Sequence, residues 1–189
     1  MTPLLISNMS FFKNIFGKKE EPKPFSRTPL DLDLGYIFEY DLRSWEVQAV
    51  YEYDWGDEDF SKEFKVSDGI DTYFLAVEED DEVELVWSQK IPLAKIEGDI
   101  AEEIIQKERP PETIIYESKT YYLDEECPGY FHEKGEPEDQ WTEFIAWEYY
   151  DESEHYNLSI EQWGERSFEA SLGRVLAPHE ISDILPRKL

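Results

Sequence analysis

Apolar and polar positions alternate with a period of two along most of the chain after Gly35, which is the pattern of β-strands. Segments 36–55, 60–67 and 71–78 are dense in Tyr, Trp, Val and Ile, and short stretches rich in Gly, Asp and Glu separate them. In segment 71–78 the residues of both faces are largely apolar, so we expect this strand to be covered on both sides.

One of these strand pairs occurs twice in the sequence. Residues 71–93 read as strand, turn and strand, and residues 154–176 repeat them at an offset of 83 residues. The correspondence places Tyr73, Leu75, Val77 and Glu78 on Tyr156, Leu158, Ile160 and Glu161.

The duplication extends beyond this hairpin. Residues 40–47 correspond to residues 116–123 at an offset of 76, so the second copy carries about seven extra residues. We expect them in the loop region around 128–140. A single unit of this kind has one apolar face and exposed edges, and two units related by a pseudo-twofold axis can cover each other.

One convincing internal helix lies between the two copies, at residues 97–109. Asp99 can cap its first turn, and a pair of prolines, Pro110 and Pro111, ends it. Its apolar stripe consists of Ile100, Ile104 and Ile105. The tail 177–185 is expected to form one last helical turn or two.

These patterns predict a mainly β fold: two similar antiparallel β units, related by an internal repeat and a pseudo-twofold axis, packed as a sandwich or barrel-like body with one short helix between them. We expect the two units to form one compact domain. Residues 1–30 are a basic leader and Pro-rich linker, and residues 31–96 are the first β unit. Residues 97–112 are the connecting helix, and residues 113–189 are the second β unit.

The leader contains a short amphipathic segment, residues 9–19, which Gly17 and the following prolines end. It either lies in a membrane interface, caps the protein's own core or has no fixed structure. Met9 resembles a translation start, so residues 1–8 are expected to be an upstream extension. The candidate membrane contacts are Phe11, Phe12, Ile15, Phe16, Lys13, Lys18 and Lys19.

Charge is placed unevenly along the chain. The formal net charge is −27; residues 1–30 carry five basic side chains against two acidic ones, or +3, so the remainder carries −30. An acidic body repels phosphate backbones and attracts basic proteins and cations, so we expect no nucleic-acid binding and a basic protein partner, unless the charge serves solubility alone. A single cysteine, Cys127, excludes an internal disulfide and fits a cytoplasmic location.

Motifs for catalysis, cofactors or metals are absent from the sequence. It has no Gly-rich phosphate loop with lysine, no dinucleotide fingerprint and no nucleophile elbow. Cys127 and His132 have a loose metal-like spacing, but no second pair supports it, and residues 54–59 lack the ligand order of a calcium loop. We therefore expect no catalytic, cofactor-binding or metal-binding residue, and we expect Cys127 to be packed in or near a loop.

Two glutamates, Glu78 and Glu161, occupy the same place in both copies. They form either a paired acidic site across the pseudo-axis, able to hold a cation, or simply a charged residue where each strand enters its turn, and the sequence favours the second interpretation. Aromatic faces beside carboxylates can also bind amines, although most tryptophans are core residues. The candidate aromatic residues are Trp45, Trp55, Trp141, Trp147 and Trp163, of which Trp141 and Trp163 join Glu78 and Glu161 as the candidate ligand or partner surface.

Recurring positions in residues 113–181 carry a family resemblance. The order of Trp141, Glu143, Leu158, Ile160, Glu161 and Trp163, followed by "GRVLAPHEI", resembles the bacterial domain-of-unknown-function family 4178. The first half is similar but looser, because no tryptophan follows Glu78 as Trp163 follows Glu161. The resemblance implies a fold but no activity, and a genetic setting beside membrane-stress proteins of the phage-shock A type and polyamine-biosynthesis enzymes.

The best prediction of function is a non-enzymatic interaction or adaptor module of the bacterial cytoplasm, peripheral at the inner face of the membrane through residues 9–19. Three alternatives stay open. The first is a sensor that binds polyamines or other organic cations, and the second is a hydrolase that uses a pair of carboxylates in a cleft. The third is a decoy that mimics DNA through its acidic surface.

Overall fold

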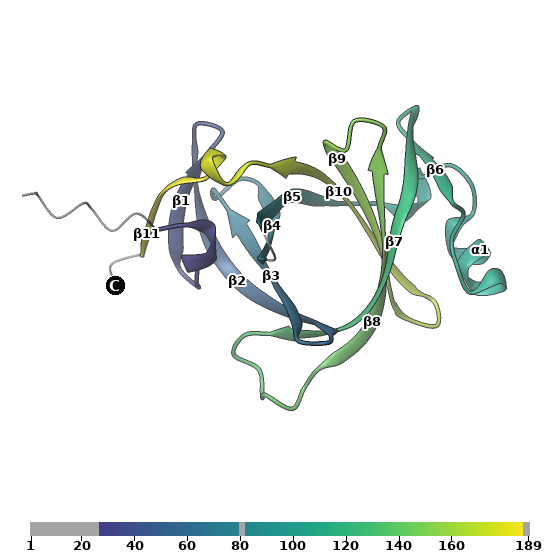
Figure 1. Ribbon diagram of the computed structural model, residues 1–189, viewed down its shortest axis with the longest axis horizontal. Coiled ribbons are helices and arrows are strands. Elements are labelled where there is room, and N and C mark those ends of the chain that lie inside the picture. The colour runs from purple at the N-terminus through teal and green to yellow at the C-terminus, as the bar shows by residue number, and fades with distance from the viewer. Residues whose placement is uncertain (1–26, 80–81, 187–189) are drawn as a thin grey trace, which may run out of the picture.

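A computed structural model describes residues 27–79 and 82–186 of the chain (Figure 1). Within these ranges it contains eleven strands, one α-helix and three short 3₁₀ turns. The first half contains η1 (Pro29–Asp31), β1 (Tyr36–Tyr40), β2 (Arg43–Gly56), β3 (Asp59–Ser67), β4 (Thr72–Glu79), β5 (Val83–Ile91) and η2 (Leu93–Lys95). The second contains α1 (Ile100–Lys107), β6 (Thr113–Tyr116), β7 (Lys119–Glu133), β8 (Thr142–Asp151), β9 (Tyr156–Gly164), β10 (Ser167–Leu176), η3 (Pro178–Glu180) and β11 (Ser182–Pro186).

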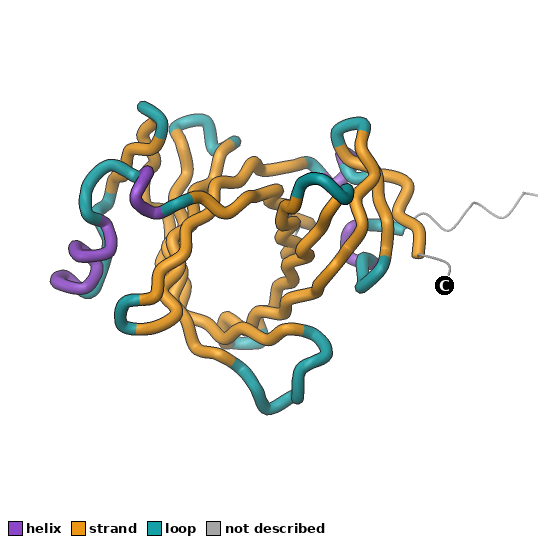
Figure 2. The backbone as a smooth tube through the Cα atoms, turned by 180° about the vertical axis from the view of Figure 1, so that it is seen from behind, coloured by secondary structure: helices purple, strands orange, loops and turns teal. Residues whose placement is uncertain are grey.

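All strands in the described ranges belong to one antiparallel sheet, in the order β11-β1-β2-β3-β4-β5-β10-β9-β8-β7-β6. An additional pairing of β2 with β7 closes strands β2–β5 and β7–β10 into a ring, which surrounds an open centre in the backbone trace (Figure 2). The predicted mainly β fold with a barrel-like body is confirmed. The β5–β10 seam pairs the edge that each half would expose there, and β11 and β6 remain the two edges of the sheet.

The ring has a pseudo-twofold axis, because equivalent strands of the two halves meet at both seams. The offset of 76 carries Asp54 onto Tyr130, and these two residues are partners in the β2–β7 seam. The offset of 83 carries Gln89 onto Leu172, and these are partners in the β5–β10 seam. The axis therefore passes through both seams, and the predicted internal repeat is confirmed.

Local details repeat as well. The β1–β2 turn places Asp41 and Leu42 at positive φ, and the β6–β7 turn does the same with Glu117 and Ser118. The extra residues of the second copy lie in the β7–β8 connection at 134–141, whereas β2 and β3 are joined by two residues. This agrees with the predicted insertion around 128–140.

Each half packs its outer face into a separate apolar core. In the first half the outward side chains of β2–β5, such as Phe64 and Leu75, pack beneath β1 and β11; in the second half those of β8–β10, such as Trp147 and Leu158, pack beneath α1 and β6. The alternation of strand residues explains this, since outward positions are mostly apolar and inward positions mix aromatic, small and charged side chains.

The predicted helix is present but shorter, because α1 spans only residues 100–107, and the Asp99 carboxylate accepts a hydrogen bond from the backbone N–H of Glu102 at 3.3 Å. The tail differs from the prediction of one or two helical turns: after the short turn η3 it forms strand β11, which pairs with β1. The pairing partner lies more than 140 residues away in the sequence, so local pattern did not indicate it. Cys127 lies inside strand β7, not in a loop.

Gly173 of β10 makes the β5–β10 seam possible. A Cβ atom at this position would lie 2.6 Å from Val86 Cγ1 and 3.3 Å from Ser88 Cβ. We expect Gly173→Ala to lower the free energy of unfolding by about 1–3 kcal/mol through overpacking, measured by urea denaturation. Gly164→Ala is the matched control, because its Cβ would meet nothing closer than Ser167 Cβ at 3.9 Å. Equal stability of the two variants would contradict this packing.

Candidate functional site

The ring encloses a cavity of about 440 Å³, and every one of its eight strands contributes to the lining. This volume lies within the range of pockets that hold small molecules. The described residues that line it include nine acidic ones and one lysine, although the Glu126 carboxylate accepts the indole N–H of Trp147 in the outer core and so faces away from the interior. The charged side chains are Asp59, Glu63, Glu78, Glu84, Asp124, Glu125, Glu126, Glu148, Glu161 and Lys62.

The cavity exists because the two copies have diverged at inward positions. At several inward positions one copy carries a bulky side chain and the other a small one. The pairs, taken at the offsets of 83 and 76, are Lys90 with Gly173, Phe74 with Asn157, Phe144 with Ser61 and Tyr53 with Gly129. The small side chains leave part of the interior unfilled.

Aromatic side chains fill another part of the interior. Phe144 stacks on Trp163 at a centroid distance of 4.6 Å, and Trp163 meets Phe131 edge to face at 5.2 Å. Tyr53 packs against Phe144 at 5.6 Å and lies stacked on Trp55. This cluster fills that part of the interior with rigid apolar rings.

Lys90, on β5, lies beside this cluster, because the Glu161 carboxylate that it contacts also accepts the indole N–H of Trp163. Its Nζ atom lies 3.1 Å from Glu161 Oε2 and 3.1 Å from Glu169 Oε2, and it lies 5.5 Å from the centroid of the Phe74 ring. Burial opposes the positive charge, but Glu161 and Glu63 together raise the pKa of Lys90, so it is an ammonium ion at neutral pH.

Glu63 lies between this ammonium group and the cavity. The hydroxyl of Tyr53 donates a hydrogen bond of 3.1 Å to Glu63 Oε2. Burial raises the pKa of Glu63 to about 7, and the negative charge of Glu161 adds to the shift while Lys90 opposes it. At neutral pH this carboxyl group therefore exchanges its proton readily.

Glu148 lies on the opposite wall of the lining, on β8. Its carboxylate accepts hydrogen bonds of 2.6 Å from Asn157 Nδ2 and 2.6 Å from Ser159 Oγ. Burial raises the pKa of Glu148, and these two hydrogen bonds lower it. Burial also raises the pKa of Cys127 to about 12, helped by Glu125 and Glu148, so its thiol stays protonated and unreactive at neutral pH.

The structure brings three of the four residues of the predicted ligand or partner surface together. Glu78 and Glu161 both line the cavity, and the indole N–H of Trp163 donates to Glu161 Oε2 at 3.1 Å. Trp141 lies outside the ring interior, where it stacks on His132 at 5.0 Å and donates to the carbonyl of Glu138. The candidate membrane contacts at residues 9–19 lie outside the described residues.

Among the other candidate tryptophans, Trp55 lines the cavity, whereas Trp45 and Trp147 are buried in the two outer cores. Sequence reasoning missed three charged groups at inward positions of the ring, Glu63, Lys90 and Glu148. A usable signal was present, since each lies at an inward position next to a large apolar outward residue: Phe64 beside Glu63, Ile91 beside Lys90 and Trp147 beside Glu148.

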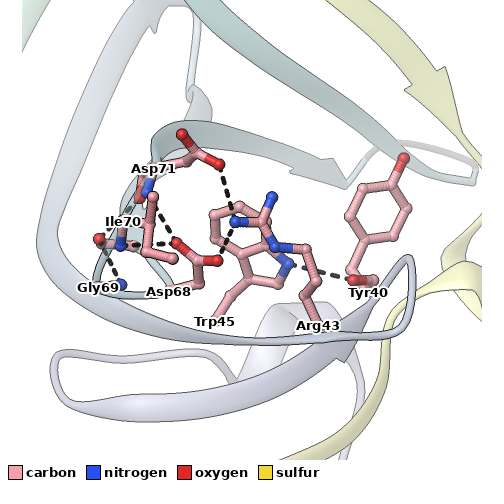
Figure 3. Close-up of polar contacts among 8 residues, drawn as sticks. Tyr40, Arg43, Trp45, Asp68, Gly69, Ile70 and Asp71 are labelled. Carbon is pink, nitrogen blue, oxygen red and sulfur yellow. Dashed lines mark hydrogen bonds and ion pairs between the residues drawn. The ribbon is translucent and has the colours of Figure 1, made fainter.

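A second polar cluster, on β2 and the β3–β4 turn, supports the fold. The Arg43 guanidinium lies over the Trp45 ring at 4.8 Å and pairs with Asp68 and, at 2.8 Å, with Asp71 (Figure 3). Asp68 Oδ1 also accepts the backbone N–H groups of Ile70 and Asp71, and these hydrogen bonds hold the Asp68 pKa below its usual value.

The second copy repeats the ion pair at the equivalent positions, Lys119 and Asp151, but its cation lies over Tyr156, which is the equivalent of Tyr73 and not of Trp45. Lys119 lies 3.8 Å from Asp151 and 3.6 Å from the centroid of the Tyr156 ring, and Asp151 accepts the backbone N–H of Tyr156. Because every polar group of the cluster serves a turn and both copies keep it, its role is structural.

Two further properties bear on the site. No helix in the described ranges is long and apolar enough to cross a membrane. Within the same ranges, no three His, Cys, Asp or Glu side chains are grouped closely enough to hold a metal ion. The carboxylates of the cavity are spread over its walls instead of converging on a point.

Ring, repeat and cavity together define an all-β protein whose two homologous halves enclose an acidic interior. The chain belongs to the family described as "Domain of unknown function (DUF4178)", which matches residues 33–178. The resemblance found in the sequence is therefore confirmed. A protein of Aquifex aeolicus (strain VF5), described as uncharacterised, is 31% identical over 178 residues, which cover 93% of this chain and 96% of that protein. No solved structure matches the chain.

Proposed function

We propose that this protein is a non-enzymatic binding module that holds a small organic cation inside its ring. The observation that carries the proposal is the cavity of about 440 Å³ lined, within the described residues, by one lysine and nine acidic residues, of which Glu126 alone is directed to the outer core. An interior so acidic is unfavourable when empty of cations, because like charges repel more strongly away from bulk water.

The lining favours an extended organic cation. Its carboxylates lie on different strands, so a ligand with charge at its end and an apolar body fits better than a compact ion. Aromatic side chains at Tyr53, Trp55 and Tyr150 line the same space and offer faces to an alkyl chain or to its charged end. This supports the cation-binding alternative over the others.

Catalysis by an acid pair has one observation in its favour, the Glu63 carboxyl group with a pKa of about 7 in a cavity that also contains Glu161. A general acid needs such a proton at neutral pH. However, Tyr53 holds Glu63, while Lys90 and Trp163 hold Glu161, so both carboxyl groups already have partners within the protein. We therefore propose binding without chemical conversion.

The predicted adaptor role and basic partner involve the acidic outer surface, and the predicted membrane contact involves residues 9–19. These stay predictions, and they are compatible with a module that reports on a bound cation.

Calorimetric titration with 1,4-diaminobutane, at pH 7.5 and low salt, tests the proposal. We expect saturable binding of the diamine and no binding of 1,4-butanediol, which has nearly the same shape without charge. Glu148→Gln is expected to weaken binding at least tenfold, because it removes one carboxylate from the wall, about 1.4 kcal/mol or more.

The matched control is Glu154→Gln, which removes a carboxylate from the exposed β8–β9 turn. Diol binding equal to diamine binding, or equal losses in the two variants, would show that the cavity is not the site.

A further inference from the structure

We propose that a groove beside the first outer core binds a segment of the protein's own leader, residues 9–19. The inference goes beyond the cation site of the cavity and does not depend on it.

The groove has a volume of about 430 Å³ and lies where strand β3 begins. Its lining includes Leu30, Phe64 and Val77, which belong to the first outer core or pack against it. Phe60 of β3 and Trp141 of the β7–β8 connection line it as well, and they are 59% and 38% exposed. Large apolar side chains that face solvent together are typical of a binding surface.

In the second half a helix covers the corresponding core. The offset of 83 carries Phe64 onto Trp147, and Trp147 shares the second outer core with Ile100 and Ile104 of α1. The offset of 76 carries the last four residues of α1 onto residues 28–31, where the first half has only the three-residue turn η1. Among the described residues, the first core therefore lacks the amphipathic cover that α1 gives the second.

Residues 9–19 have the side chains that such a groove accommodates. They contain three lysines, no acidic residue and four large apolar side chains, which are Phe11, Phe12, Ile15 and Phe16. Burial of these apolar side chains against the groove removes them from water, which is favourable. The charged residues of the groove, Glu52 and Glu79 against Lys62, are acidic on balance and attract the lysines.

The chain also enters the described structure at the groove. Leu30 lines the groove, and ten residues, 20–29, separate it from Lys19. An extended chain of that length spans about 33–36 Å, so residues 9–19 can reach the whole groove. A short tether gives an effective concentration on the order of millimolar, which favours the protein's own leader over that of a second copy.

This placement selects one of the three interpretations that the sequence allows for residues 9–19, the one in which they cover the protein's own core. The same apolar side chains cannot lie in the groove and in a membrane interface at once. A membrane is therefore a competing occupant, and the experiment distinguishes it.

Limited proteolysis of the full chain with chymotrypsin, which cuts after aromatic residues, tests the inference. The rate of cleavage at residues 11–16 follows the population of released leader when release is fast. We expect Phe60→Ser, which removes an aromatic ring from the groove without adding charge, to raise this rate at least about fivefold. Ile70→Ser is the matched control, because Ile70 is 87% exposed beyond the opposite end of β3, and it should leave the rate unchanged.

Equal cleavage rates in the wild type and Phe60→Ser would overturn the inference. Protection that weakens on dilution of the protein would also overturn it, because the occupant would then be the leader of a second copy. Protection that appears only with vesicles containing anionic lipid would overturn it in favour of a membrane. If Phe60→Ser does not fold, Trp141→Ala removes the other exposed ring of the groove, and an unchanged rate in that variant would overturn the inference.

Discussion

Replacing Phe64 with alanine is expected to lower the free energy of unfolding by about 3–5 kcal/mol. The side chain is fully buried on β3, in the core between the ring and strands β1 and β11. Truncation removes a large apolar surface from contact and leaves a cavity, since the closely packed strands around it relax only partly.

The equivalent position of the second half, at the offset of 83, is Trp147, which is 1% exposed in the other outer core. Trp147→Ala is expected to have a similar cost. Because both seams tie the halves into one ring, each variant should unfold in a single transition.

Urea unfolding followed by both fluorescence and circular dichroism measures the two effects. Ile70→Ala is the control, because Ile70 is 87% exposed and its truncation should cost little stability. Two separate transitions, or losses near 1 kcal/mol, would contradict the assignment of these residues to the cores of one cooperative unit.

Replacing Glu63 with glutamine is expected to stabilise the protein above pH 7, by about 1–3 kcal/mol. Burial raises the folded-state pKa of Glu63 to about 7, against an ordinary value of 4.5. Between these two pH values the folded protein keeps a proton that the unfolded chain has released. Stability from this group is therefore complete below pH 4.5 and declines as pH rises to 7.

Glutamine keeps an acceptor for the Tyr53 hydroxyl and has no charge to desolvate. The free energy of unfolding, measured by urea denaturation from pH 5 to pH 8.5, should fall with pH more steeply in the wild type than in Glu63→Gln. Glu154→Gln, on an exposed turn, should follow the wild-type curve. Parallel curves for wild type and Glu63→Gln would contradict the burial of this carboxyl group.

Much of the fold could be predicted because the same period-two pattern occurs twice. The matched Tyr-x-Leu-x-(Val/Ile)-Glu segments fixed the correspondence of Glu78 with Glu161, and the change of offset from 76 to 83 located the insertion between β7 and β8. Local signals also placed α1 correctly, since Asp99 caps it as expected.

Ring closure could not be predicted in the same way. It depends on four residue pairs between β2 and β7, Tyr51–Asp54 with 130–133, and on β11 returning to β1. Such pairings join segments that are distant in the sequence. The period-two pattern shows which face of a strand is apolar, but it does not show which strand pairs with it.

The candidate site was only partly visible for a related reason. The duplicated glutamates indicated an acidic pair, and both do line the cavity. The favoured interpretation, a simple charge where each strand enters its turn, stays a prediction beside the paired-site interpretation. Glu63, Glu148 and Lys90 have no motif, and their importance comes from closure of the ring and from loss of bulk at Gly173 and Asn157.

The most direct measurement is a crystal structure of the full chain grown with 1,4-diaminobutane at a concentration that saturates the calorimetric signal. The account predicts the amine inside the ring, one nitrogen within about 2.7–3.2 Å of a carboxylate oxygen of Glu148 and its alkyl chain along the aromatic wall. An amine found only on the outer surface, with the interior unchanged, would contradict the claim that the acidic cavity is a binding site for organic cations.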